Sequence, residues 1–440
     1  MERLQALARQ VRELPPLRHF GEVTAVQGGV IHVSGLGLQA ALGDRVAVHS
    51  RNGQCLAGEI VSLQASLAAI LPEAPAEGLS LGARVELLPA LALAPAESWV
   101  GRIVDPLGQP LDGRPLRPGV APRSYRASPP AAAGRNRLGA RLDTGLAVLD
   151  TLLPLVRGQR MGLFAGSGVG KSTLLAQLAR NVTADLVVIA MIGERGRELR
   201  EFVEDTLGAE GMARSIVVAA TSDQSPLMRR RCAWAAMAVA EHFRDQGRHV
   251  LLLADSITRF AEAHREIALA AGESPSYRGF PPSTAHLIMS LAERSGPGPA
   301  GLGDITAIFS VLVAGSDMEE PVADILRGTL DGHVVLDRAI AERGRFPAID
   351  VLRSVSRALP QAASAEENAR IARTRNLLGT YAESELMIRA GLYAPGSDPR
   401  LDEAVRLYPA LDHFLTRRTQ DTRHGFRLLD EALSGRVSHD

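Results

Sequence analysis

The residues most able to do chemistry lie in one glycine-rich turn, where residues 160–175 read RMGLFAGSGVGKSTLL. An apolar strand leads into the turn, and Lys-Ser-Thr opens a helix after it. Gly166, Gly168 and Gly170 let successive backbone N–H groups point at a phosphate, which a Cβ at those positions would obstruct. The helix that follows adds the partial positive charge of its N-terminus. The pattern predicts a phosphate-binding loop.

The residues at the end of this loop predict which groups of a nucleotide it binds. We expect Lys171 to reach the β- and γ-phosphates of ATP and the Ser172 hydroxyl to bind Mg²⁺. The general pattern begins with glycine, whereas this chain has Ala165 there. A glycine-rich turn without a ligand is the alternative, but the preceding strand and the Lys-Ser pair in register argue against it. The predicted nucleotide-binding residues of the loop are Ala165, Gly166, Ser167, Gly168, Val169, Gly170, Lys171, Ser172 and Thr173.

A second magnesium anchor is predicted at Asp255. The segment HVLLLADSITRF is an apolar strand that ends in this carboxylate, which is the Walker B arrangement. Such a carboxylate holds Mg²⁺ directly or through water. Asp255 could also cap the following helix, and the two roles do not exclude each other.

Hydrolysis also needs a group that polarises water and a positive charge on the γ-phosphate. Glu194 follows the apolar strand in LVVIAMIGERGREL, and its carboxylate could accept a proton. A surface glutamate in a charged turn fits the spacing equally well. Arg195 and Arg357 are candidate cations, although the spacing does not separate either from an ordinary salt-bridged arginine.

The densest basic cluster is Arg229-Arg230-Arg231, at the start of a helix predicted over residues 226–246. A helix N-terminus disfavours cations. We interpret the cluster as solvated or as a subunit contact, with anion binding as the alternative.

Composition narrows the class of protein. The chain has 440 residues, 46% of them hydrophobic, and a formal net charge of zero, which argues against a dominant nucleic-acid surface. Cys55 and Cys232 form no metal-ligand or disulfide pattern, which fits a reducing cytoplasm. No transmembrane run or secretion signal is expected. The histidines show no ligand spacing, so Mg²⁺ is the only metal predicted.

The pattern along the chain predicts an α/β protein with flanking domains. Residues 1–20 are expected to hold a short amphipathic helix, and residues 21–90, with alternating strands and glycine turns, a small β-barrel. Residues 91–360 alternate strands and helices, which indicates an α/β core with a mainly parallel sheet. Its expected strands lie at residues 161–164, 186–191, 216–219, 250–254 and 305–313. Residues 361–440 are expected to form a helical domain.

Six segments together resemble one family. They are GRIVDPLGQPLDG (101–113), TGLAVLDTLLPLVRGQRMGLFAGSGVGKSTLL (144–175), IGERGREL (192–199), DSITRFAEAHREIALAAGESPSYRGFPPS (255–283), RFPAIDVLRSVSR (345–357) and GLYAPGSDPRLDEAV (391–405). These resemble the type III secretion ATPases, which are relatives of the catalytic subunit of rotary ATP synthase. The likeness is greatest to the flagellar protein-export ATPase and covers roughly residues 20–405. It implies a RecA-like form for the predicted α/β core of residues 91–360.

The resemblance implies a role for each candidate residue. Glu194 would be the catalytic carboxylate and Arg195 its cationic neighbour. Phe346 would stack on adenine, where the synthase subunit has tyrosine. Arg357 would be a finger that reaches the nucleotide of a neighbouring subunit. Lys171, Ser172 and Asp255 would keep the roles given above, with ATP as substrate and Mg²⁺ as cofactor.

By the same analogy, the resemblance implies a homohexameric ring. The implied partners are stator-like and stalk-like proteins, an export gate and chaperone–substrate complexes. The implied location is the cytoplasm, peripheral to the export apparatus of the inner membrane, and no nucleic acid is expected to bind.

Three other functions compete with this one. An injectisome ATPase differs only in the secretion system that it serves. A rotary synthase subunit would need other partners, and it usually carries acidic residues where this chain has GLYAPGSDPRLDEAV. A ring helicase or RNA translocase would want basic pore loops and an aromatic-basic barrel face, which the neutral charge and the 4% aromatic content do not favour.

Overall fold

The computed structural model describes residues 18–50, 53–313 and 318–435 of the chain. The helix predicted within residues 1–20 falls mainly on residues outside these ranges. The chain divides into two compact units, which are described separately below. The barrel unit comprises Met1–Ala92, Asp223–Arg231 and Ala261–Thr284, and the sheet unit comprises Leu93–Ser222, Cys232–Phe260 and Ala285–Asp440. None of the helices in the described ranges combines the length and apolar character that crossing a bilayer requires.

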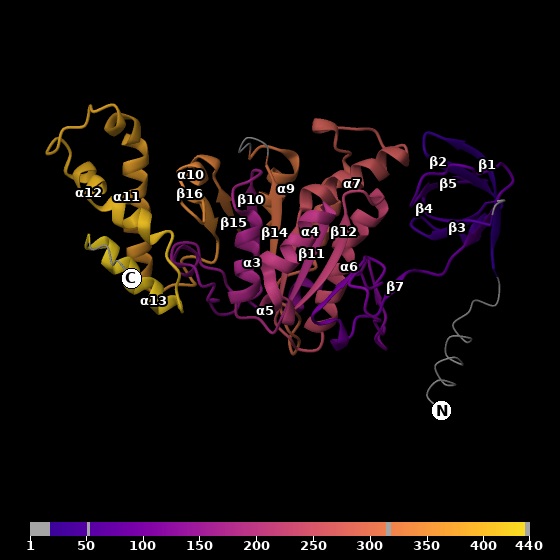
Figure 1. The fold of residues 1–440 in the computed structure, drawn as a ribbon, viewed down its shortest axis with the longest axis horizontal. Helices are drawn as coiled ribbons and strands as arrows, with labels where there is room; N and C mark the ends of the chain where they lie inside the picture. The colour runs from indigo at the N-terminus through magenta and orange to yellow at the C-terminus, as the bar shows by residue number, and fades with distance from the viewer. Residues whose placement is uncertain (1–17, 51–52, 314–317, 436–440) are drawn as a thin grey trace. The chain divides into compact units, whose positions relative to one another are not determined.

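The barrel unit contains the predicted small β-barrel. Its strands pair in the order β1-β2-β5-β4-β3-β6, all antiparallel, and the barrel closes through β1 and β6 (Figure 1). The strands are β1 Phe20–Gln27, β2 Val30–Ser34, β3 Arg45–His49, β4 Cys55–Leu63, β5 Leu67–Pro72 and β6 Arg84–Leu87. Alternate side chains such as Ile31 and Val33 are fully buried and fill the interior. Other elements of this unit are the 3₁₀ turns Gly37–Gln39 and Tyr277–Gly279, the start of α6 (Pro226–Arg244) and most of α7 (Ile257–Ala270).

The arginine cluster of α6 is buried inside the barrel unit. Arg230 is 2.7 Å from one carboxylate oxygen of Glu59 on β4, and Arg231 is 2.8 Å from the other. Arg231 also pairs with Glu73. Burial of charges is tolerated when they are paired and hydrogen-bonded in this way. The interpretation of Arg230 and Arg231 as solvated was therefore wrong.

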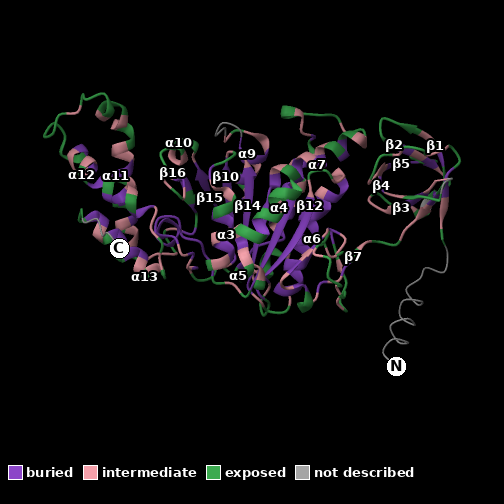
Figure 2. Ribbon diagram, in the orientation of Figure 1, coloured by how far each residue is buried: buried purple, intermediate pink, exposed green. Residues whose placement is uncertain are grey.

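The sheet unit is built on eight strands in the order β16-β15-β10-β14-β13-β11-β12-β8. All pairings in the described sheet are parallel except that of β15 with β16, which confirms the mainly parallel α/β core. The strands are β8 Arg102–Val104, β10 Arg160–Ala165, β11 Leu186–Glu194, β12 Ser215–Thr221, β13 Val250–Asp255, β14 Ile305–Leu312, β15 Gly332–Leu336 and β16 Ile349–Ser356. Figure 2 shows the central strands as buried, as continuous apolar runs require.

All five predicted strands are present, whereas β8, β15 and β16 were not predicted. β8 has only three residues, and β16 alternates buried and exposed side chains at an edge. The short β7 (Ala92–Leu93) and β9 (Arg123–Ser124) pair separately. The remaining helices before the C-terminal region are α2 Ala147–Asp150, α3 Lys171–Asn181, α4 Gly196–Glu201, a π-helical turn Phe202–Leu207, α5 Gly208–Ala213, α8 Ser283–Glu293, α9 Pro321–Thr329 and α10 Arg338–Glu342, with 3₁₀ turns at Glu97–Trp99 and Ala132–Gly134.

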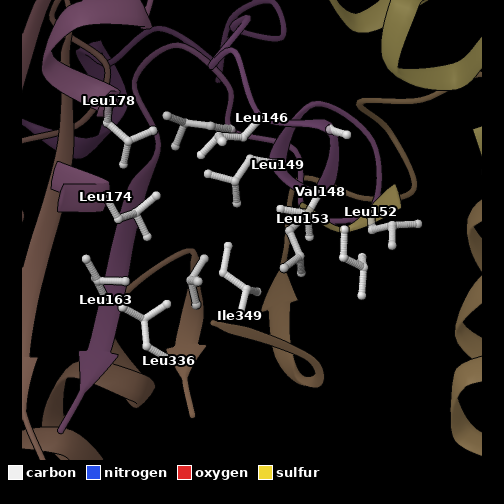
Figure 3. Close-up of a cluster of buried hydrophobic side chains, with 14 of the residues drawn as sticks. Leu146, Val148, Leu149, Leu152, Leu153, Leu163, Leu174, Leu178, Leu336 and Ile349 are labelled. Carbon is white, nitrogen blue, oxygen red and sulfur yellow. The ribbon is translucent and has the colours of Figure 1, made fainter. Parts of the chain in front are cut away.

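An aliphatic core holds α3 against this sheet. Figure 3 shows side chains of α2 and the segment after it converging with those of β10, α3 and the β15–β16 edge. The labelled residues are Leu146, Val148, Leu149, Leu152, Leu153, Leu163, Leu174, Leu178, Leu336 and Ile349. This packing fixes where α3 begins, and therefore where the glycine-rich loop lies.

Three helices follow the sheet: α11 Ala365–Arg389, α12 Pro399–Phe414 and α13 Thr422–Leu433. They confirm the predicted helical C-terminal region. A reciprocal capping box of Ser364 and Glu367 starts α11. Hydrogen bonds connect the start of α13 and the residues before it to the segment around α2: the Thr419 hydroxyl donates to Asp150 at 2.5 Å, and the Thr422 hydroxyl donates to Asp143 at 2.9 Å.

The buried pairing in the barrel unit leads to a stability prediction. Glu59→Ala should destabilise this unit by about 3–5 kcal/mol, because it leaves two buried guanidinium groups without their shared carboxylate. Glu266→Ala is the matched control, since it removes the half-exposed partner of Arg229 and should cost less than about 1 kcal/mol. Hydrogen exchange of β4 and of the start of α6 measures the difference. Equal protection in the two variants would contradict the prediction.

Candidate active site

Three functional strand ends meet at one edge of the sheet. β10 ends at Ala165, β13 at Asp255 and β11 at Glu194. β14 separates β10 from β13, and β11 pairs directly with β13. Because these strands run parallel, their carboxyl ends lie together, where ligands of such sheets bind. Glu194 is the last residue of β11, so the expectation that it follows the strand was one residue off.

The glycine-rich loop joins β10 to α3. Gly168 and Gly170 have φ values of +76° and +88°, which glycine adopts readily and other L-residues rarely do. Gly170 is also the N-cap of α3 and supplies no side-chain hydrogen bond to the first turn. The backbone N–H groups of that turn therefore have no side-chain cap and can face a phosphate. Ala165 is the buried last residue of β10, so it belongs to the strand as much as to the loop.

Lys171 lies between the two carboxylates. Its Nζ donates to Oδ1 of Asp255 and is 3.8 Å from Oε1 of Glu194. The Lys171 and Glu194 side chains are mostly buried, and that of Asp255 almost fully. The Lys171 ammonium thus faces both buried carboxyl groups beside the loop.

A β-bulge aims Glu194 at this cluster. The pairing of β11 with β12 shifts register between Ile192 and Glu194, and Gly193 between them has a φ of +70°. A bulge bends its strand and redirects the side chains next to it. The bulge was not predicted, and the glycine in IGERG is the sequence signal that could have indicated it.

The surroundings raise the pKa of Glu194 to about 7. Burial is the largest cause, because it penalises the charged form, and the neighbouring charge of Asp255 acts in the same direction. The Lys171 ammonium opposes both effects. A carboxylate with a pKa near neutrality is suited to proton transfer at physiological pH.

The oxygens near the loop suit a magnesium ion. Ser172 lies exposed in the first turn of α3. Lys171 and Ser310 both donate hydrogen bonds to Oδ1 of Asp255, so neither of them occupies the other carboxylate oxygen. A hydroxyl and a carboxylate are hard oxygen donors, as Mg²⁺ prefers. The described residues contain no group of three or more histidine, cysteine or acidic side chains that could hold a metal ion.

Phe346 lies against the glycine-rich loop. A Cβ at Gly170 would be 3.4 Å from the Phe346 ring, and the ring remains 52% exposed. The preceding residue, Arg345, pairs with Asp412 of α12 at 3.0 Å and donates to the carbonyl of Ile349. The structure therefore places a half-exposed aromatic face beside the predicted phosphate site.

Two predicted cations lie apart from the carboxylate cluster. The Arg195 side chain is 79% exposed and is 3.5 Å from Glu198. Arg357 follows β16, is exposed, and donates to the carbonyl of Arg327 at 3.2 Å. The structure thus joins Lys171, Glu194 and Asp255, with Phe346 beside the loop, and leaves the two arginines facing solvent.

Comparison with known proteins gives two matching family models. Residues 145–356 match the nucleotide-binding domain of the ATP synthase alpha/beta family, and residues 363–426 match the T3SS EscN ATPase C-terminal domain. The two models together cover the sheet strands from β10 to β16, all the candidate site residues except Arg357, and the C-terminal helices as far as the start of α13.

Curated relatives match over nearly the whole chain. The flagellum-specific ATP synthase of Caulobacter vibrioides is 45% identical over 95% of this chain and 96% of its own. That of Bacillus subtilis is 41% identical over 99% of this chain and 98% of its own. Among solved structures, the assembled ATPase EscN of an enteropathogenic E. coli type III secretion system superposes with a TM-score of 0.86 and 34% identity, over 94% of this chain and 100% of EscN. EscN in complex with its central stalk EscO gives a TM-score of 0.84.

The raised pKa of Glu194 leads to a pH prediction. Below about pH 7 the carboxylate is protonated and cannot accept a proton, so kcat/KM for ATP should rise with pH through a midpoint near 7. Glu198 raises the pKa of Glu194, so Glu198→Gln should move this midpoint to lower pH. Initial rates from pH 5.5 to 9 measure both profiles. An acid limb that does not move in Glu198→Gln would contradict the assignment to Glu194.

Proposed function

The chain belongs to the family of flagellar and type III secretion ATPases, relatives of the ATP synthase alpha and beta subunits, and we propose how it hydrolyses ATP. It is an ATPase, and in this proposal a homohexameric ring hydrolyses ATP at its subunit interfaces to energise the export of unfolded proteins. The observation that carries the proposal is the Lys171, Glu194 and Asp255 cluster beside the glycine-rich loop.

Binding of ATP rearranges the charges of this cluster. Lys171 leaves Asp255 and pairs with the β- and γ-phosphates, which carry more negative charge than one carboxylate. The backbone N–H groups at the start of α3 bind the same phosphates. Ser172 and Asp255 would hold Mg²⁺, which would supply charge neutralisation of the phosphates. Phe346 stacks on adenine, since its exposed ring lies next to Gly170.

Glu194 then activates the attacking water. Its carboxylate takes a proton while the water oxygen forms a bond to the γ-phosphorus, and the bond from that phosphorus to the β,γ-bridging oxygen breaks. The products are ADP and inorganic phosphate. In this proposal Arg357 of one subunit stabilises the negative charge that develops at the neighbour's site, and Arg195 adds a cation at the mouth of its own site.

Two comparisons favour a flagellar export ATPase over a rotary synthase subunit and an injectisome ATPase, and a third supports the proposed ring. The C-terminal match to the T3SS EscN ATPase domain favours export over a rotary synthase. The curated relatives are named flagellum-specific and reach 45% identity, whereas EscN is 34% identical, which favours the flagellar branch over an injectisome. EscN is described as assembled and as bound to a central stalk, which supports a ring and a stalk-like partner.

The finer parts of the proposal follow from this membership. The barrel of residues 21–90, the catalytic domain of residues 91–360 and the helical domain of residues 361–440 act as three domains of one subunit. Stator-like proteins, an export gate and chaperone–substrate complexes are further partners. The ring works in the cytoplasm at the inner-membrane export apparatus, and it needs no nucleic acid.

Glu194→Gln tests the proton-transfer step. The variant keeps the shape of the side chain but loses the carboxylate, so turnover should fall by about 10²–10⁴-fold, with ATP affinity nearly unchanged. Glu198→Gln is the matched control, because Glu198 is the half-exposed carboxylate four residues on, and its variant should retain most of the turnover. Steady-state rates and nucleotide titration measure the two effects. Hydrolysis by Glu194→Gln within about threefold of the wild type would remove Glu194 from the mechanism.

A mixture of two inactive variants tests the shared site. Arg357→Ala and Glu194→Gln should each be inactive alone, yet mixed rings contain interfaces that pair an intact Glu194 with a neighbour's intact Arg357. If the subunits mix at random, about one interface in four is of this kind, so about a quarter of the activity should return.

The control mixture combines Lys171→Ala with Glu194→Gln, whose two losses fall in the same subunit's site. It should recover nothing, since no interface in it has both groups. Mixed rings are verified by tag exchange. A failure of the first mixture to recover, or recovery by both mixtures, would refute the assignment of Arg357 to the neighbour's site.

A further inference from the structure

One side chain in the sheet touches the predicted magnesium carboxylate but was not among the predicted site residues. Ser310 lies on β14, the strand between the loop strand β10 and the Asp255 strand β13. On one side it is paired in register with Leu163 of β10. On the other side β13 and β14 pair as far as Ala254 and Phe309, so Ser310 and Asp255 are the next residues along the two strands.

Ser310 is one of two polar residues on β14, the other being Thr306. The strand reads ITAIFSVL, and the Ser310 side chain is fully buried. A buried hydroxyl without a partner is costly, so its hydrogen bond must be made within the protein. Ser310 donates it to Oδ1 of Asp255 at 2.5 Å.

Nucleotide binding should affect the two hydrogen-bond donors to Asp255, Lys171 and Ser310, differently. Lys171 donates to the same Oδ1, but under the proposed mechanism it moves to the phosphates. Ser310 is held in the central sheet and cannot follow. When ATP binds, Ser310 is therefore the protein donor that stays on this carboxylate and fixes the plane of its two oxygens.

We propose that Ser310 is a positioning residue, which holds Asp255 so that the second carboxylate oxygen faces the magnesium site. Groups that orient metal-binding side chains commonly contribute about 10–100-fold to metal affinity or activity. The inference rests on the proposed role of Asp255. A purely structural hydroxyl would affect folding and would leave the magnesium dependence unchanged.

Ser310→Thr and Ser310→Val form a matched pair, because valine and threonine have nearly the same shape and differ in the hydroxyl. Any strain from the added methyl group is common to both. The measurement is the affinity for a non-hydrolysable ATP analogue, by calorimetry, over a range of magnesium concentrations and in EDTA. This binding readout does not depend on turnover.

The expected result separates the pair. Ser310→Val should need about tenfold or more Mg²⁺ for half of the magnesium-dependent gain in nucleotide affinity, with binding in EDTA unchanged. Ser310→Thr should need the wild-type concentration. The kcat of Ser310→Val should fall with little change in the KM for magnesium–ATP at saturating metal. If threonine and valine give the same magnesium dependence, the inference is wrong.

Two further variants make the experiment decisive. If the added methyl group prevents folding, Ser310→Ala against the wild type gives the same comparison, since alanine removes only the oxygen. Asp255→Asn tests the premise: it should abolish most of the magnesium-dependent gain. A normal gain in Asp255→Asn would overturn the proposed magnesium role of Asp255, whereas a loss there with a normal gain in Ser310→Val would overturn the role of Ser310 alone.

Discussion

The charge balance around Lys171 is the constraint on which the rest of the site depends. A single ammonium lies between Asp255 and Glu194, both largely removed from water. Two buried carboxylates without a cation would be strongly unfavourable, and one of them would bind a proton instead. Burial and the charge of Asp255 raise the pKa of Glu194, and the attraction of Lys171 acts against both effects.

In the proposed mechanism, Lys171 moves from Asp255 to the phosphates, and ATP adds further negative charge to the site. Compensating positive charge would then come from Mg²⁺ held by Ser172 and Asp255 and from Arg195 and Arg357. The sheet determines where these groups would meet, because it brings the ends of β10, β11 and β13 to one edge and places the Ser310 hydroxyl on Asp255.

The sequence predicted those parts of the site that repeat a strong local pattern. The loop, Lys171 and Asp255 each follow an apolar strand, and parallel strands bring their carboxyl ends together. Glu194 could be assigned only through the family resemblance, since its turn also contains Arg195, Arg197 and Glu198. The bulge at Gly193 and the bond from Ser310 depend on strand register, which apolar runs do not specify.

Contacts between distant segments were the harder part of the fold to predict. The pairing of Arg230 and Arg231 with Glu59 joins residues about 170 positions apart in sequence, so a basic triplet at a helix start looked solvated. The antiparallel edge strand β16 was missed because its Asp350, Arg353 and alternating exposure do not resemble a buried parallel strand. In both cases partners from elsewhere in the chain decided the outcome.

Burial divides the site into a preformed half and an open half. Lys171 and Ser310 both donate hydrogen bonds to Asp255, and Asp255 and Ser310 lie on strands of the central sheet. Phe346, Arg195 and Arg357 are exposed, and the last two find only weak local partners within the described structure. An arginine stabilises a transferring phosphoryl group strongly only when water is excluded around it, since bulk solvent weakens the interaction several-fold. In the proposed ring, a neighbouring copy of the chain would cover this open half and would bring its own Arg357. Under that proposal hydrolysis would depend on assembly, because an isolated subunit would lack both the cover and the arginine.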